Sequence, residues 1–378
     1  MSSLVGSRII EPLWYNKNIV KILINLIGGQ TAPNFIAARQ YKPDKILNIC
    51  SKDTENKSMM FKKTFGESHF LDDIVLNDPF DLSELETAIE NIKEKHINDE
   101  IILNFTGGTK PMSIGSFNGF INNNSKLIYI DSQYNRIIEY TKDTKTIKDI
   151  DCIISIKEHF AMYGHSFKEK GIDSKNNQRE EKDRLKNYLK ENYSSAKEFI
   201  KKYAKKYNDE KGYFKEDNEF IFNESNKAKW TREGKKLEII VNSNRFNFEG
   251  DNFHKYFTGL WFEDLVLEKF EEYNVFNQLK YNLSFPNLDK KGEDDAELDF
   301  VAIKGHKLYI FEVKSGTLDR NYIYKLSSIK NLFSNLFAGI YFITFEENTD
   351  VKFKNMLKAF GIKVIPYSGL ESFLNNLK

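Results

Sequence analysis

Short apolar runs alternate with longer amphipathic stretches over residues 1–150 of the chain. One of these stretches opens with Asp81-Leu82-Ser83-Glu84, an acidic helix start, and is expected to stay helical to about Ile97. Strands that alternate with helices in this way predict a mostly parallel sheet with helices on its faces, the doubly wound α/β class. The runs expected to form its strands are Val20–Ile27, Ile46–Ser51, Phe70–Leu76, Glu100–Phe105 and Leu127–Asp131.

A basic, less apolar pattern follows between Lys157 and Glu238. This stretch holds 21 Lys and Arg against 16 Asp and Glu, and a helix is expected over Arg179–Tyr207. The helix ends in a lysine-rich sequence, which fits either a solvated helix face or a contact with a nucleic-acid backbone. The four lysines of that sequence are Lys201, Lys202, Lys205 and Lys206.

A third pattern begins after Asn252. It predicts a helix, a hairpin, a second helix, a strand and a final helix–strand–helix tail. The expected ranges are Phe257–Tyr273 for the first helix, Asn321–Phe333 for the second and Gly339–Phe345 for the strand. The chain is therefore expected to divide into an α/β domain at 1–150, a basic connecting segment at 151–250 and a second αβ domain at 251–378.

Composition narrows the class of protein. Aromatic residues make up 14% of the 378 residues, enough apolar surface to order the chain, and the net charge is only +1. Two cysteines argue against a disulfide framework. Neither a spanning apolar run nor a secretory signal is visible, so we expect a soluble, cytoplasmic protein without a membrane partner. A net charge near zero still permits a local basic patch that binds nucleic acid.

Two glycine loops follow the first and fourth expected strands. Gly28-Gly29-Gln30-Thr31 is the first loop, and Thr106-Gly107-Gly108-Thr109-Lys110-Pro111 is the second. In a sheet of order 3-2-1-4-5 these strands are neighbours, and ligands bind beyond their carboxyl ends. Glycines allow close backbone approach, and a helix N-terminus beside Lys110 favours an anion. Neither common nucleotide-binding signature is present, and two tight turns remain an alternative interpretation.

A pair of carboxylates is predicted on one β-hairpin. Glu-x-Lys occurs four times, but only Glu312-Val313-Lys314 lies in an apolar strand, where unpaired charges are costly. A two-residue turn at Gly305-His306 would place Asp299 opposite Glu312 and Glu297 opposite Lys314. Two opposed carboxylates suit Mg²⁺ or Mn²⁺, and the alternative is a buried salt-bridge cluster.

Metal-assisted hydrolysis of a phosphodiester is the chemistry that these residues imply. Asp299 and Glu312 would hold the metal ion, the carbonyl of Val313 could join them, and Lys314 would stabilise the transition state. Glu263 lies on the apolar stripe of the expected helix at Leu260–Phe270, as a third carboxylate of the site or as the edge of an amphipathic helix. The six histidines are scattered, so neither a zinc site nor a His-based triad is indicated.

These residues resemble two known families. Asp299, Glu312-Val313-Lys314 and an upstream helix with Glu263 are similar to the PD-(D/E)xK nucleases, whose αβββαβ core fits Phe257 to Phe345 if a strand lies near Gln278–Phe285. The proline of the PD motif is absent here, because Leu298 precedes Asp299. The Thr-Gly-Gly-Thr-Lys loop resembles the CRISPR-associated Rossmann-fold (CARF) sensor. Together the two halves resemble the CARF nuclease effectors of type III CRISPR defence.

The resemblance implies a homodimer activated by a cyclic oligoadenylate, most often cyclic tetra-adenylate, that cleaves RNA or DNA. The ligand-binding positions carried over from the family are Gln30, Thr31, Ser51, Thr106, Gly107, Gly108, Thr109 and Lys110. Two rival hypotheses are a constitutive DNA-repair or restriction-type nuclease and a nucleotide-responsive regulator that binds DNA without cleaving it.

Overall fold

The computed structural model describes residues 19–169, 178–209, 217–250, 253–286, 296–316, 338–346 and 351–378. They form two compact units, Met1–Ile150 and Asp151–Lys378. The helix predicted at Asn321–Phe333 lies outside the described residues. Among the helices that are described, none has the length and apolar character needed to cross a bilayer.

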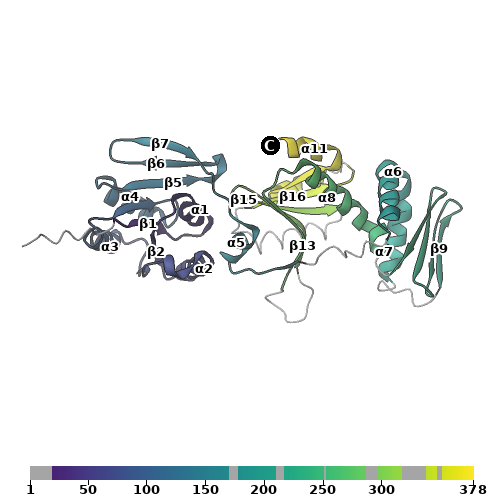
Figure 1. Cartoon of the computed structure of the whole chain (residues 1–378), viewed down its shortest axis with the longest axis horizontal. Helices are drawn as coiled ribbons and strands as arrows, with labels where there is room; N and C mark the ends of the chain where they lie inside the picture. The colour runs from purple at the N-terminus through teal and green to yellow at the C-terminus, as the bar shows by residue number, and fades with distance from the viewer. Residues whose placement is uncertain are drawn as a thin grey trace, which may run out of the picture. The chain divides into compact units, whose positions relative to one another are not determined.

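The first unit is built on a seven-stranded sheet of order β3-β2-β1-β4-β5-β6-β7 (Figure 1). The five parallel strands confirm the predicted 3-2-1-4-5 order, and the antiparallel strands β6 and β7, which the sequence analysis did not anticipate, extend the edge beyond β5. The strands are β1 Lys21–Leu26, β2 Lys45–Ser51, β3 Ile74–Leu76, β4 Glu100–Asn104, β5 Lys126–Asp131, β6 Arg136–Tyr140 and β7 Lys145–Asp149.

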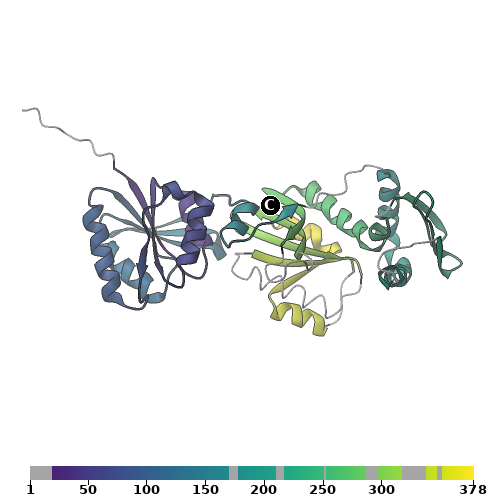
Figure 2. The ribbon, with the colours of Figure 1, turned by 90° about the horizontal axis from the view of Figure 1, so that it is seen from below.

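Helices cover both faces of this sheet (Figure 2). Leu85 and Ile89 of α3 and Met112 of α4 pack against Ile24 and Leu26 of β1 in one buried apolar layer. As predicted, α3 starts at an acidic cap, because the carboxylate of Asp81 accepts a hydrogen bond from the backbone N–H of Ser83. The helices are α1 Ala32–Tyr41, α2 Glu55–Phe65, α3 Leu82–Lys95 and α4 Lys110–Ile121.

The second unit contains a six-stranded sheet of order β17-β16-β15-β14-β13-β8. The strand expected near residues 278–285 is β13, and it pairs antiparallel with β14, the first strand of the predicted hairpin. The second hairpin strand, β15, pairs parallel with β16. The strands are β8 Lys168–Glu169, β13 Gln278–Phe285, β14 Ala296–Lys304, β15 Lys307–Lys314, β16 Ala338–Thr344 and β17 Ile362–Pro366.

Helices pack around this second sheet. The helix expected from residue 257 begins earlier and is irregular, with a short α7, a π-helical turn and then α8. The helix–strand–helix tail predicted at the end of the chain is present as α10, β17 and α11. The bounds are α5 Ile156–Ala161, α7 Phe253–Lys255, the π-helix Tyr256–Leu260, α8 Trp261–Tyr273, α10 Val351–Ala359 and α11 Tyr367–Asn375.

The middle segment belongs to the second unit. It consists of the long helix α6 and a four-stranded antiparallel sheet of order β12-β11-β10-β9 (Figure 1). Tyr193 and Phe199 of α6 share one buried cluster with Trp230 of this sheet and with Phe257 and Trp261. The elements are α6 Arg179–Asp209, kinked at Asn192, and β9 Asn218–Asn223, β10 Asn226–Thr231, β11 Lys236–Val241 and β12 Asn244–Glu249.

Candidate functional site

The two glycine loops meet at the carboxyl ends of β1 and β4, as their predicted adjacency requires. A Cβ atom added to Gly28 would lie 2.7 Å from the backbone nitrogen of Gly108, and one added to Gly107 would lie 2.1 Å from the carbonyl oxygen of Leu26. Gly108 also has a φ of +77°, which residues with side chains rarely adopt. The close contact between the loops therefore depends on glycine at these positions.

A row of buried asparagines lies behind the loops. Asn25 pairs in register with Asn48 on one side and Asn104 on the other, and all three side chains are fully buried. The Asn104 amide donates hydrogen bonds to the side-chain oxygens of Asn25 and of Asn34 on α1, each at 3.0 Å. Its oxygen accepts from the Thr106 hydroxyl at 2.7 Å. Buried polar groups need such partners, so the network fixes β1, α1 and the second loop to one another.

The hydroxyl groups predicted to bind a ligand are engaged within the protein. The Thr106 hydroxyl accepts from the backbone N–H of Ile130 at 2.7 Å, and the Thr109 hydroxyl donates to the Pro79 carbonyl at 2.7 Å while capping α4. Ser51 is buried and bonded to Thr54, and Thr31 is also buried. These four side chains therefore shape the loops from within.

Exposed groups at the same edge of the sheet are those suited to an anion. Gly29 and Gln30 of the first loop are exposed, and so is Lys110 at the start of α4. Lys57 on α2 donates to the Gly29 carbonyl at 3.0 Å, which brings a second ammonium group to the first loop. Backbone N–H groups of a helix start, together with two lysines, form an environment that favours phosphate or carboxylate.

The hairpin in the second unit has the predicted register over most of its length. Ile303 pairs with Leu308 and Phe300 with Phe311, across a turn in which Gly305 has a φ of +60°. The described pairing of β14 with β15 ends at Phe300 and Phe311, one position before Asp299 and Glu312. The Asp299 carboxylate accepts a hydrogen bond from the backbone N–H of Val313 at 2.7 Å. This contact brings the Asp299 side chain to the β15 backbone next to Glu312, and the position of Asp299 opposite Glu312 stays a prediction.

Glu263 on α8 lies in the electrostatic field of the same strand. Burial raises its pKa to about 7, the negative charge of Glu312 adds to the increase, and Lys314 opposes it. Glu312 itself is only 3% exposed. The smaller influence of Glu297 on the Glu263 pKa is also an increase. Glu263 of the helix therefore lies within electrostatic range of Glu312 and Lys314 of the hairpin.

These residues suit a hard divalent cation. In the part of the chain that the structure describes, no cluster of three His, Cys, Asp or Glu side chains is arranged to hold a metal. Mg²⁺ needs fewer protein ligands, since it retains several waters and is held by one or two carboxylates. Asp299 and Glu312, with the carbonyl of Val313 directly after Glu312, supply such oxygen donors. A cation would also relieve the repulsion that raises the Glu263 pKa.

The sequence analysis missed a contact between α6 and the residue that follows β15. The Tyr193 hydroxyl donates to the carbonyl of Ser315 at 2.5 Å, one residue beyond Lys314. The Tyr193 ring packs against Phe345 and Trp261, at centroid separations of 4.8 Å and 5.5 Å. Apolar residues at helical spacing mark Tyr193 as buried, but nothing local to the sequence indicates a partner 122 residues away.

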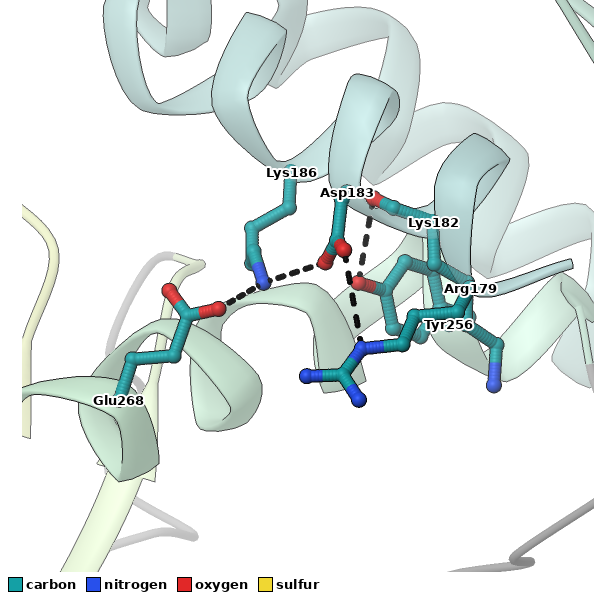
Figure 3. A network of polar contacts seen from close by, with 6 residues as sticks. All are labelled: Arg179, Lys182, Asp183, Lys186, Tyr256 and Glu268. Atoms are coloured by element: carbon teal, nitrogen blue, oxygen red, sulfur yellow. Dashed lines mark hydrogen bonds and ion pairs between the residues drawn. The ribbon is translucent and has the colours of Figure 1, made fainter. Parts of the chain in front are cut away.

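A second set of contacts, a polar network, connects α6 with α8 (Figure 3). Lys186 contacts both Asp183 and Glu268, and its side chain is nearly buried. Burial alone would lower the Lys186 pKa, but the hydrogen bonds to these two acids outweigh it, so that the pKa is raised. The Tyr256 hydroxyl donates to the Lys182 carbonyl at 3.3 Å. The helix that carries Glu263 is therefore held in place by α6.

Comparisons with known proteins match both halves of the chain. Residues 22–159 match the Card1 CARF domain, and residues 251–378 match the Card1-like endonuclease domain. None of the curated proteins compared with the chain matches it.

Solved structures share the fold over most of this chain. Can2 from Sulfobacillus thermosulfidooxidans, solved in complex with cyclic tetra-adenylate, is 19% identical with a TM-score of 0.72, over 94% of this chain and 98% of that one. Protein VC1899 from Vibrio cholerae is 13% identical with a TM-score of 0.72, over 94% and 96%. A type III CRISPR defence DNA nuclease activated by cyclic oligoadenylate reaches 0.53 at 12% identity, over 89% and 51%.

At these identities the likeness to solved structures establishes the fold, and the two domain matches identify the two halves of the chain. The chain therefore has a Card1-type CARF domain ahead of a Card1-like endonuclease domain.

Proposed function

We propose that this protein is a nuclease of type III CRISPR antiviral defence, activated by cyclic tetra-adenylate, dependent on Mn²⁺ or Mg²⁺, and non-specific toward RNA, DNA or both. The observation that carries the proposal is that Glu312 and Lys314 act electrostatically on Glu263, with Asp299 bonded to Val313, in a chain that also has a CARF domain and an endonuclease domain. The proposed form is a cytoplasmic homodimer, and light scattering of the purified protein tests its subunit number.

The activator is inferred to bind at the glycine loops. A cyclic oligoadenylate presents phosphates, and Lys110, Gln30 and the backbone of Gly107 and Gly108 are the groups proposed to contact them. The relative Can2 was solved with cyclic tetra-adenylate, which supports that ring size here. Thr31, Ser51, Thr106 and Thr109 are proposed to act by keeping the loops in shape, because their side chains are buried or hydrogen-bonded within the protein.

Each proposed catalytic residue is assigned a separate role in the reaction. Asp299, Glu312 and the Val313 carbonyl would hold the divalent cation, which on binding activates water and neutralises charge on the phosphate. The Asp299 contact to the Val313 N–H orients that carboxylate. Lys314 would bind the developing phosphate charge, and Glu263, with its pKa near 7, can accept or release a proton at neutral pH.

A four-way assay tests the function: labelled RNA, single-stranded DNA and plasmid, each with and without cyclic tetra-adenylate and Mn²⁺. Cleavage is expected only with both additions. Glu312→Gln should abolish it, whereas Glu271→Gln, an exposed acid on α8, should not. Full cleavage without the ligand would identify a constitutive nuclease instead. Binding of duplex without cleavage under any metal would identify a DNA-binding regulator.

A further inference from the structure

The outward side of α6 carries an unbalanced positive charge beyond the kink at Asn192. Residues 193–209 hold five lysines against two acids, Glu198 and Asp209, whereas ion pairs such as Arg184 with Glu181 recur before the kink. We call the five lysines the lysine face. They are Lys197, Lys201, Lys202, Lys205 and Lys206.

The lysine face is accessible and largely without acidic partners. Lys201, Lys202 and Lys205 are exposed, and Lys206 is partly so. Among the described residues, no acidic side chain lies within 4.0 Å of these four ammonium groups; only Lys197 has one, Glu346 at 3.2 Å. A solvated helix face normally mixes both signs of charge, as the first half of α6 does.

Aromatic rings hold two of the lysines in position. The Lys202 ammonium lies 4.9 Å from the Phe222 ring centroid, and the Lys206 ammonium lies 5.7 Å from that of Phe220. Both phenylalanines belong to β9 and pack against Phe199 of α6. The cation–π contacts restrict the two side chains, which lowers the entropy lost when they bind an anion.

One end of the lysine face lies at the edge of the nuclease site. Lys197 and Ser194 both contact Glu346, which follows the end of β16. Thr344, the last residue of β16, pairs with Lys314. From Lys197 to Lys206 the face extends nine residues, about 13.5 Å at 1.5 Å per helical residue. That length matches about three to four nucleotides of a helical strand.

We propose that the lysine face binds the phosphate backbone of the nucleic-acid substrate as it leaves the nuclease site. This inference rests on the proposed function, because the polyanion is the nuclease's own substrate. The face then contributes to substrate affinity, independently of base sequence, and takes no part in bond cleavage. Its contribution weakens as salt rises, because lysine–phosphate contacts release counterions.

The test compares two double variants of the full-length protein. Lys201→Gln with Lys205→Gln removes two charges from the face. Lys227→Gln with Lys229→Gln is the matched control, since those β10 residues alternate with the buried Ala228 and Trp230 and lie on the other side of the four-stranded sheet. Binding of labelled single-stranded RNA, single-stranded DNA and duplex is measured over a range of KCl in the Glu312→Gln background, with saturating cyclic tetra-adenylate.

Loss of two phosphate contacts should reduce the salt slope of log affinity by about 1.4 for a single strand and about 1.8 for a duplex. Extrapolated from equal binding at 1 M salt, affinity at 0.1 M should fall about 25-fold for a single strand and about 60-fold for a duplex. In the protein with Glu312 intact, the lysine-face double variant should have a correspondingly higher KM. Its kcat should stay within about twofold, because the lost contacts bind substrate and transition state equally.

A lysine-face variant that matches the control in slope, affinity and KM would overturn the inference. If the unmodified protein cleaves normally, that result leaves the proposed nuclease function intact. If the unmodified protein cleaves nothing, the proposed function fails, and the binding arm still decides whether the face contacts nucleic acid.

Discussion

Replacing Glu263 by glutamine tests the electrostatics of the nuclease site without relying on activity. Burial and the nearby Glu312 raise the Glu263 pKa from 4.5 to about 7, so the folded protein holds this proton more tightly than the unfolded chain. The contribution of protonated Glu263 to the free energy of unfolding should therefore be fully present at low pH. It should be lost as the pH rises from about 4.5 through about 7. A shift of this size corresponds to about 3 kcal/mol at pH 8. Glutamine has the same shape and never ionises.

Guanidinium unfolding in the presence of a chelator provides the measurement. Trp230 and Trp261 are buried in the second unit, so their fluorescence reports its unfolding. At pH 8 the variant should be more stable than the unmodified protein by up to about 3 kcal/mol, and at pH 5 the difference should fall to about 1 kcal/mol or less. Mn²⁺ should stabilise the unmodified protein more at pH 8, because the cation offsets the repulsion between Glu263 and Glu312.

The control is Glu271→Gln, an exposed position on the same helix, which should leave the pH dependence unchanged. The reasoning is wrong if Glu263→Gln loses stability between pH 5 and pH 8 as steeply as the unmodified protein. Such a result would mean that Glu263 ionises without hindrance and does not share a field with Glu312.

Three further predictions concern the contacts behind the two sites. Gly107→Ala, whose Cβ would meet the Leu26 carbonyl at 2.1 Å, should force the loops apart and abolish cyclic tetra-adenylate binding in calorimetry, while the second unit still unfolds as before. Asn104→Ala should lower the stability of the first unit by about 1–3 kcal/mol, measured by hydrogen exchange of β1 and β4, because buried partners lose their hydrogen bonds. Tyr193→Phe should cost about 1 kcal/mol and lower kcat more than it changes KM, because only the bond to the Ser315 carbonyl is lost; unchanged kcat would contradict this.

Local sequence patterns were sufficient for part of this structure. The strand order of the first unit and the meeting of its glycine loops followed from apolar runs and from the rule for parallel sheets. The turn at Gly305 likewise predicted the hairpin register as far as Phe300. One step further the Asp299 carboxylate accepts a hydrogen bond from the Val313 N–H, and the position of Asp299 opposite Glu312 stays a prediction.

Long-range packing accounts for what the sequence did not reveal. The row formed by Asn25, Asn48 and Asn104 was visible as polar residues within apolar strands, but its role depends on α1 supplying Asn34. The bond from Tyr193 to Ser315 likewise joins segments far apart in sequence. The ligand-binding role predicted for Thr106 and Thr109 was carried over from the family's loop motif, and in the structure their hydroxyl groups bond to nearby carbonyl, amide and side-chain groups.

The aromatic cluster shared by the middle segment and the nuclease sheet determines where the protein can be divided. A fragment that begins at residue 251 would keep Phe257 and Trp261 but lose Tyr193, Phe199 and Trp230, which cover them. Its newly exposed rings would favour aggregation over folding. A fragment that begins near residue 151 would retain every partner, so the smallest autonomous endonuclease unit should be sought there, well upstream of the proposed catalytic residues.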